Sequence, residues 1–181
     1  VSLTSNSALQ EQFTTITSPT AGTAVSAANS PTNWTLTATN GNTWRGTAQT
    51  TGTSGGWYSN NNLSFLGSGS ATNAQATLRL QNNSGTTLTG FTLSFAARLW
   101  KTGSASPQVT VSWSNSATAT NPTAGALTNS LTSCTFSDAT ANISTGTTRT
   151  QTVTSLSVAS GQYIFIRFIN PGGANGDNLG W

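Results

Sequence analysis

The feature of this chain that most constrains its fold is a hydrophobic alternation with a period of two residues. In the stretch 91–100, Phe91 and Leu93 fall on one face of an extended strand, while Thr92 and Ser94 fall on the other. Such alternation is typical of half-buried β-strands, and no long segment keeps the 3.6-residue stripe of an amphipathic helix. The sequence therefore predicts an all-β protein.

Other stretches extend this prediction. Residues 78–80 and 109–113 alternate in the same way, and residues 163–169 are apolar on both faces, which predicts a central strand covered on both sides. Weaker strand candidates, mostly rich in threonine, are residues 10–16, 33–38, 43–48, 133–136 and 151–158. Together these segments predict an antiparallel two-sheet sandwich of the jelly-roll type.

Turn and loop signals separate the predicted strands. Asn82-Asn83-Ser84-Gly85 lies between two strand signals and predicts a hairpin. Three polar stretches, at residues 46–62, 114–130 and 170–180, are predicted to be long loops, and loops of this length often carry function.

The composition supports one folded domain. The chain has 181 residues, 34% of them hydrophobic, with six Trp and seven Phe. That is enough apolar surface to build a single core. We expect an N-terminal arm at residues 1–12 and one β-sandwich domain at residues 13–181.

Charge is scarce, at 5% of residues, and the net charge is +3. A surface of neutral Ser, Thr, Asn and Gly repels neighbouring molecules weakly, which suits self-assembly or contact with a glycan. The basic residues are dispersed, so no basic run can neutralise adjacent phosphates, and nucleic acid is not an expected partner. No stretch approaches the roughly 20 apolar residues of a membrane span. The chain begins with Val, as a chain does after removal of a leader, so we expect a secreted or cell-surface protein.

The side chains that usually carry catalysis are nearly absent. There is no His, and the three acids, Glu11, Asp138 and Asp177, stand in unrelated contexts. Cys134 has no His to activate it and is expected to be a buried free thiol. The sequence therefore predicts a protein that is not an enzyme and that needs no cofactor.

Two segments are candidate binding sites. Asn175, Asp177 and Asn178 form an oxygen-rich stretch that is a weak Ca²⁺ candidate, because one carboxylate is few for that ion; the alternative is a turn in which Asp177 bonds its own backbone. Trp57 and Tyr58, with Trp44 if it lies nearby, are candidates for stacking on a sugar. The alternative is that Trp57 plugs one end of the sandwich.

Two surface patterns are weaker indications of a binding site. Arg98 and Trp100 are two residues apart on one strand face, so either the two side chains stack or Arg98 simply faces water. Thr-x-Thr runs occur at residues 35–39, 118–120 and 150–154. Because they share no fixed period, ordinary exposed strand threonines are expected instead of a regular binding face.

Several motifs follow one another in a recognisable order: Gly56-Trp57-Tyr58-Ser59, Leu66-Gly67-Ser68-Gly69-Ser70-Ala71, residues 80–89, residues 95–103, and Phe165-Ile166-Arg167-Phe168 followed by residues 175–181. In this order the chain resembles, over about residues 13–181, an uncharacterised family of secreted bacterial β-sandwich domains that often carry cell-surface sorting signals. The resemblance implies an extracellular location and no established enzyme activity. Family members continue past the Asp177-like turn into a closing strand, so either a tail follows Trp181 or one sheet edge stays open.

The function expected from these observations is a structural subunit of an extracellular filament, fibre or sheath. An unpaired sheet edge invites another chain, and the arm, with Val1, Leu3 and Leu9 as its apolar side chains, is suited to act as a donor strand for a second copy. The alternative is that the arm folds back on its own domain. The second expected function is a carbohydrate-binding or adhesive surface module.

Overall fold

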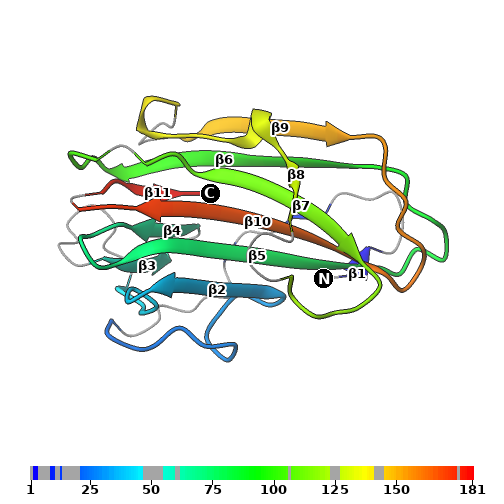
Figure 1. Ribbon diagram of the computed structural model, residues 1–181, viewed down its shortest axis with the longest axis horizontal. Coiled ribbons are helices and arrows are strands. Elements are labelled where there is room, and N and C mark those ends of the chain that lie inside the picture. Colours follow the sequence, from blue (N-terminus) through cyan, green and yellow to red (C-terminus); the bar gives the residue numbers. More distant parts are fainter. Residues whose placement is uncertain are drawn as a thin grey trace.

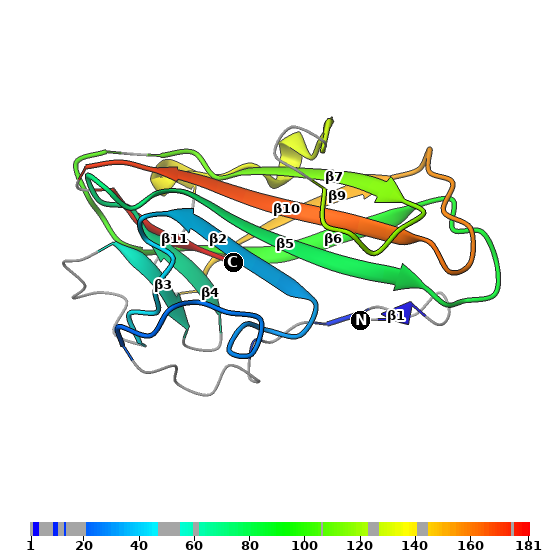
Figure 2. The same ribbon diagram turned by 60° about the horizontal axis from the view of Figure 1, so that its bottom comes forward.

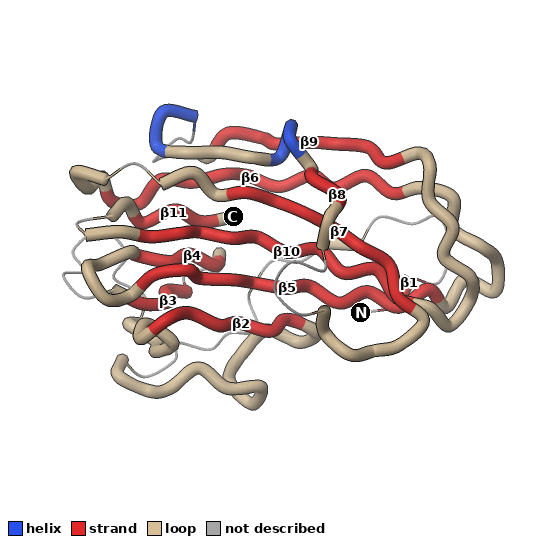
Figure 3. Tube along the Cα trace, viewed as in Figure 1, coloured by secondary structure: helices blue, strands red, loops and turns tan. Residues whose placement is uncertain are grey.

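The computed structural model describes residues 2–3, 9–10, 13, 21–46, 55–59, 62–105, 107–122, 127–140, 145–174 and 176–181. In this part of the chain, strands form two facing sheets and no α-helix occurs (Figures 1 and 3). The two short 3₁₀ turns are η1 (Thr132–Cys134) and η2 (Asp138–Thr140). The predicted all-β sandwich is confirmed.

The first sheet has the order β1-β5-β10-β7-β8, with β2 also paired to β5. Its strands are β1 (Ser2–Leu3), β2 (Trp34–Thr39), β5 (Thr72–Asn82), β7 (Thr110–Ser116), β8 (Asn129–Ser130) and β10 (Tyr163–Gly172). β2 pairs antiparallel with residues 72–78 of β5, and β1 pairs parallel with Gln81 and Asn82 (Figure 2). The two strands therefore lie one after the other along β5.

The second sheet has the order β3-β4-β11-β6-β9, and all of its pairs are antiparallel. Its strands are β3 (Gly56–Ser59), β4 (Leu63–Leu66), β6 (Phe91–Lys101), β9 (Thr147–Val153) and β11 (Asn178–Gly180). The chain passes from one sheet to the other between β2 and β3, β4 and β5, β5 and β6, β6 and β7, β8 and β9, β9 and β10, and β10 and β11. These repeated crossings are the connections of a jelly roll.

The core between the sheets is built around aromatic rings. Phe168 of β10 is stacked on Trp181 with ring centroids 4.6 Å apart, and it also contacts Trp34 at 6.0 Å and Phe95 at 5.1 Å. Phe13 packs on Trp34 at 5.4 Å. Offset and edge-on aromatic pairs of this kind stabilise a core beyond the apolar area that they bury.

β10 is the central strand that the sequence predicts, covered on both faces. Ile164, Ile166 and Phe168 are at most 2% exposed, and so is Phe165; Arg167 is 5% exposed. Residues 117–122 follow β7 and contact side chains of β2, β5 and β10; we name this segment the strap. A run that is apolar on both faces is expected for a strand buried in this way.

Arginines hold the strap. Arg79 Nη1 donates a hydrogen bond to the Ala119 carbonyl at 3.2 Å, and Arg167 Nη2 donates to the Pro122 carbonyl. Arg167 Nε also donates to Thr77 Oγ1 at 2.9 Å. Burial lowers the pKa of Arg167. In a chain with only three acids, these basic side chains are thus satisfied by neutral oxygen atoms.

The predicted hairpin at residues 82–85 is wrong, because β5 and β6 belong to different sheets. Asn82 is fully buried, and its side chain holds the connection that leads from β5 in the first sheet to β6 in the second. Its Nδ2 donates to the carbonyls of Thr86 (2.7 Å) and Val158 (2.8 Å), and its Oδ1 accepts from the backbone N–H of Ser84 (3.0 Å). A turn signal identifies a turn but does not tell which sheet the next strand joins.

Several predicted boundaries are also wrong. The predicted loops at residues 46–62 and 170–180 contain β3 and β11, and the one at 114–130 contains the end of β7 and all of β8. Of the weaker strand candidates, residues 133–136 form mostly η1, with a single bridge from Phe136 to Val109. In the candidate at residues 43–48, Thr43 and Trp44 make only isolated bridges, and residues 47–48 lie outside the described residues.

Candidate functional site

The aromatic side chains expected to stack on a sugar are inside the protein. Trp44, Trp57 and Tyr58 are 0%, 0% and 2% exposed. Trp57 packs edge-on against Phe65 with ring centroids 5.1 Å apart, and Trp44 Nε1 donates to Asn29 Oδ1 at 3.1 Å. None of the three rings offers a free face, so the prediction that they form a glycan platform is wrong. Trp57 is instead part of the core, as the alternative interpretation held.

Backbone pairing explains this burial. The N–H of Trp57 donates to the Thr43 carbonyl at 3.0 Å, and the N–H of Arg45 donates to the Trp57 carbonyl at 2.8 Å. The segment around Trp44 thus pairs with the edge of β3, and the indoles of Trp44 and Trp57 both lie in the core. Burial raises the pKa of the Tyr58 hydroxyl, while the positive charge of Arg45 acts in the opposite direction.

In the oxygen-rich turn before β11, Asp177 does not form the predicted turn with its own backbone. Asp177 Oδ1 accepts a hydrogen bond from the backbone N–H of Gly103 at 2.5 Å, so the carboxyl ties the β10–β11 loop to the β6–β7 loop instead of to its own backbone. Asp177 and Asn178 are both fully buried, and Asn175 lies outside the described residues. No group of three His, Cys, Asp or Glu side chains gathers in the described part of the chain.

The Asp177 carboxyl is chemically unusual. Its Oδ2 is buried and has no hydrogen-bond partner among the described residues. Burial raises the pKa of Asp177; the Gly103 hydrogen bond acts in the opposite direction, and the negative charge of Asp138 raises it further. Because burial without full hydrogen bonding disfavours a charge, this side chain is biased towards its neutral form.

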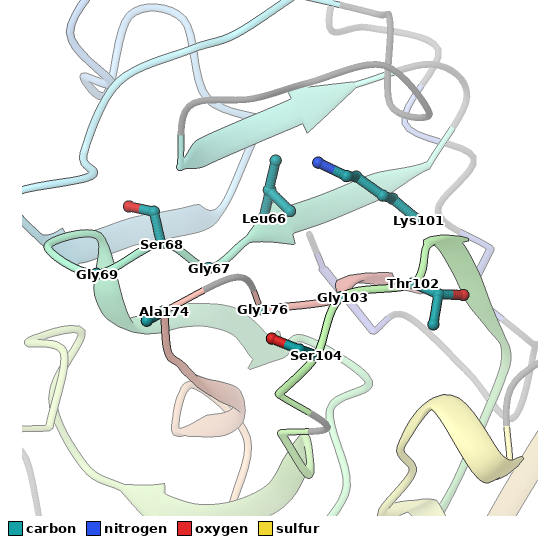
Figure 4. A pocket seen from close by; sticks show the side chains of 10 residues that line it. All are labelled: Leu66, Gly67, Ser68, Gly69, Lys101, Thr102, Gly103, Ser104, Ala174 and Gly176. Carbon is teal, nitrogen blue, oxygen red and sulfur yellow. The ribbon is translucent and has the colours of Figure 1, made fainter.

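A pocket of about 430 Å³ lies beside this turn, where three loops meet (Figure 4). The loops that follow β4, β6 and β10 supply its lining, which is mostly glycine backbone and small hydroxyl side chains: Leu66, Gly67, Ser68, Gly69, Lys101, Thr102, Gly103, Ser104, Ala174 and Gly176. A β-carbon at Gly67 would come within 2.7 Å of the Gly172 α-carbon, so only glycine permits this close approach of two loops. The charged side chain at the rim is Lys101, which reaches towards Leu66.

A row of hydroxyl groups lies on the outer face of β6 and β9 in the second sheet. On β6 and β9, Thr92 lies opposite Thr152 and Ser94 lies opposite Thr150. The hydroxyl oxygens are 2.9 Å apart in the first pair and 2.8 Å in the second. The next pair continues the row with Thr148 opposite Ala96. All five hydroxyl-bearing residues, Thr92, Ser94, Thr148, Thr150 and Thr152, are exposed. We name this set the hydroxyl face.

The hydroxyl face has a distinct feature at each end. At one end, residues 89–92 and 152–154 line an open depression of about 350 Å³. At the other end, Arg98 lies over the ring of Trp100, with the guanidinium carbon 5.5 Å from the ring centroid. Of the two alternatives that the sequence leaves open, the structure shows the stacked arrangement. All six tryptophans lie in the described residues, and Trp100 is the one that is not buried.

The predicted assembly arm is described only in part. Val1 lies outside the described residues, and Ser2 and Leu3 form β1 against β5 of the same chain. Leu9 is 42% exposed and is the one large hydrophobic side chain exposed in the described part of the chain. Phe13, the first residue of the predicted domain, is 6% exposed in the core.

Sequence reasoning missed the hydroxyl face. It treated the Thr-x-Thr run at residues 150–154 as ordinary strand surface, because the other threonine runs share no period with it. The array arises from the pairing of Thr150 and Thr152 with residues 56 and 60 positions earlier in the chain. The alternation of Thr92 and Ser94 on the polar face of their strand was the available signal.

Comparison of the chain with protein-family models, with curated proteins and with solved structures gave no match. Among the described residues, no helix has the length and apolar character needed to cross a bilayer. The function must therefore be argued from the geometry of the chain itself.

Proposed function

We propose that this chain is an extracellular carbohydrate-binding module that holds a polysaccharide along the hydroxyl face. The observation that carries the proposal is the pair of cross-strand hydroxyl contacts, Thr92 with Thr152 and Ser94 with Thr150, between exposed side chains of β6 and β9. Each hydroxyl has one donor and two acceptor sites, so a pair that shares one hydrogen bond keeps further sites for a ligand. Polysaccharides present hydroxyl groups at regular intervals and can use those sites.

The length of the face supports an extended ligand. From Thr92 to Arg98 the strand advances by roughly 20 Å, at about 3.3 Å per residue. The depression at residues 89–92 and 152–154 lies at one end of the hydroxyl face, and the pocket beside Lys101 lies past the other end. A linear polymer can follow a face of this length, whereas a small ligand would use only a part of it.

Triple replacement of Thr148, Thr150 and Thr152 by valine tests this function. Valine keeps the β-branched shape that suits a strand and removes the hydroxyl. Each lost neutral hydrogen bond is worth about 1 kcal/mol, so we expect binding to insoluble cellulose, xylan or polygalacturonate to weaken by at least about tenfold. Depletion assays with purified protein measure this.

The matched control is the triple valine variant of Thr35, Thr37 and Thr39. These residues are also exposed and alternate along β2, but they belong to the first sheet. We expect this variant to bind like the parent. Equal binding by both variants would place the site elsewhere, and a parent that binds none of the polysaccharides would refute the function.

A second candidate function, assembly into a filament, fibre or sheath, is favoured by a different observation. β1 is a strand of two residues, Ser2–Leu3, that pairs with β5 just beyond the residues of β5 that pair with β2. A strand this short is held by few backbone hydrogen bonds, so the same place on β5 can be filled by the arm of a second copy. Repeated donation from one copy to the next is head-to-tail and gives an open polymer unless the rotation closes a ring.

A disulfide trap distinguishes the two placements of the arm. Ser2 lies beside Gln81 in the pairing, so Ser2→Cys combined with Gln81→Cys can be oxidised and run on a non-reducing gel. Donation predicts a ladder of covalent oligomers, whereas an arm that stays on its own domain gives only cross-linked monomer. The Ser2→Cys single variant is the control and gives at most a dimer.

A further inference from the structure

Arg98 stands at the end of the hydroxyl face, next to two glycines. Its pairing partner on β11 is Gly180, which has no side chain. On the β9 side, a β-carbon at Gly146 would come within 3.2 Å of Arg98 Cγ, so glycine at this position leaves room for the arginine stem. The guanidinium group therefore extends from the sheet between two residues that lack side chains.

The Arg98 guanidinium also has unused hydrogen-bonding capacity. The Arg98 guanidinium contacts the Trp100 ring, and it makes no hydrogen bond or ion pair with the described residues. A cation over an indole face is held by the ring electrons, which restricts the side chain without using its N–H groups. A guanidinium has five N–H donors in a planar fork that matches a carboxylate.

No acid of the described chain competes for this position. Asp177 is fully buried and is bonded to Gly103, and Asp138 belongs to η2 and not to the strands of this face. The charge at this end of the hydroxyl face is therefore the Arg98 guanidinium, and its complement is an anionic ligand group.

We propose that Arg98 binds a carboxylate of the polysaccharide, so that the ligand of the hydroxyl face is a chain containing uronic acids. This inference rests on the proposed carbohydrate-binding function and adds the class of sugar. The hydroxyl pairs bind the neutral ring positions, and the guanidinium, positioned by Trp100, selects for the acid. Trp100 acts here as a positioning residue for Arg98.

The test uses matched polysaccharides whose carboxylates are either free or esterified. Polygalacturonate and alginate are compared with their esterified forms, which keep the backbone and mask the carboxylates. We expect the parent to bind the acidic forms about tenfold or more tighter than the esters, because a hydrogen bond to a charged group is stronger than a neutral one. Arg98→Gln should remove this preference, so that the acidic and the esterified chains bind with similar affinity.

Two further variants make the result specific. Arg98→Lys keeps the charge but loses the planar fork, and it should retain only part of the preference. Arg79→Gln removes the same charge from the first sheet, where Arg79 contacts the strap, and it should keep the parent preference. The unfolding temperature of each variant shows that it is folded.

The outcomes separate the inference from the proposed function. Equal binding of acidic and esterified chains by the parent would overturn the role of Arg98 and leave carbohydrate binding standing. A preference that survives in Arg98→Gln, or that Arg79→Gln loses equally, would also overturn it. If the parent binds neither these chains nor cellulose or xylan, the proposed function itself is refuted.

Discussion

In the sequence, Trp57 is a candidate for stacking on a sugar. Replacing it by alanine tests whether its role is structural or ligand-binding. The Trp57 side chain is 0% exposed and packs on Phe65, with a ring-centroid separation of 5.1 Å. Truncation of a buried tryptophan to alanine costs about 3–5 kcal/mol in unfolding free energy. For a chain of this size the melting temperature should fall by on the order of 10 °C.

Trp100→Ala is the matched control, because the same side chain is removed from a half-buried position on the outer face. We expect it to lose less than half of the free energy that Trp57→Ala loses. Urea titration of both variants beside the parent gives the two differences, and the slope with denaturant checks that each transition stays two-state.

A third variant tests the packing in more detail. Trp57 Nε1 is buried without a hydrogen-bond partner among the described residues, and such a group destabilises the folded state. Trp57→Phe keeps most of the ring and removes that group, so it should be clearly more stable than Trp57→Ala. If Trp57→Ala is as stable as the parent, or loses no more than Trp100→Ala, the assignment of Trp57 to the core is wrong.

Three other residues give independent predictions. Burial raises the pKa of Cys134 to about 11, so Ellman's reagent at pH 8 should label no thiol in the folded protein and one per chain after unfolding; fast labelling of the native state would contradict this. Asp177 has a raised pKa when folded, so the folded state binds the proton more tightly than the unfolded state, whose pKa is about 3.9. Relative to Asp177→Asn, the stability of the parent should therefore fall as pH rises from about 4 through the folded pKa, and a difference in urea midpoints that is independent of pH would contradict it. Arg167→Met leaves buried oxygens without their donor, and it should cost about 2 kcal/mol or more and speed amide exchange in the strap, whereas Arg98→Met should cost about 1 kcal/mol or less.

The long strands could be predicted because each is a local pattern. The alternation from Phe91 to Trp100 identified β6 and its two faces, and the doubly apolar run at residues 163–169 identified β10 as central. Both strands are long enough for a period of two to repeat several times. The fold class followed from these strands, since an all-β chain of this length must bury them in facing sheets.

The short strands could not be predicted in the same way. β3 has four residues and β11 has three, and the residues of both are buried. A segment that is buried on both faces shows no alternation, and three or four residues are too few to reveal a period. Trp57 therefore falls in a predicted polar loop, where the sequence leaves both exposure and burial open, although Gly56 allows the close approach of Thr43 and Arg45 to β3.

The hydroxyl face and the Asp177 contact escaped prediction for a different reason. Thr92 and Thr152 are 60 residues apart, and Gly103 and Asp177 are 74 apart. Their partners are fixed by the register of β6 with β9 and by the meeting of two loops. Neither can be read from composition or spacing within one segment, because register depends on the whole sheet.

Arg98 differs in its contacts from three other arginines of this chain. Arg45, Arg79 and Arg167 each donate to a backbone carbonyl, of Gly55, Ala119 and Pro122 respectively. These contacts fix loops, and they explain how basic residues are accommodated in a chain with only three acids. Arg98 instead rests on Trp100, at the end of an exposed row of hydroxyls. Because the ring contact leaves its N–H donors unused by the described residues, Arg98 keeps hydrogen-bonding capacity for a ligand.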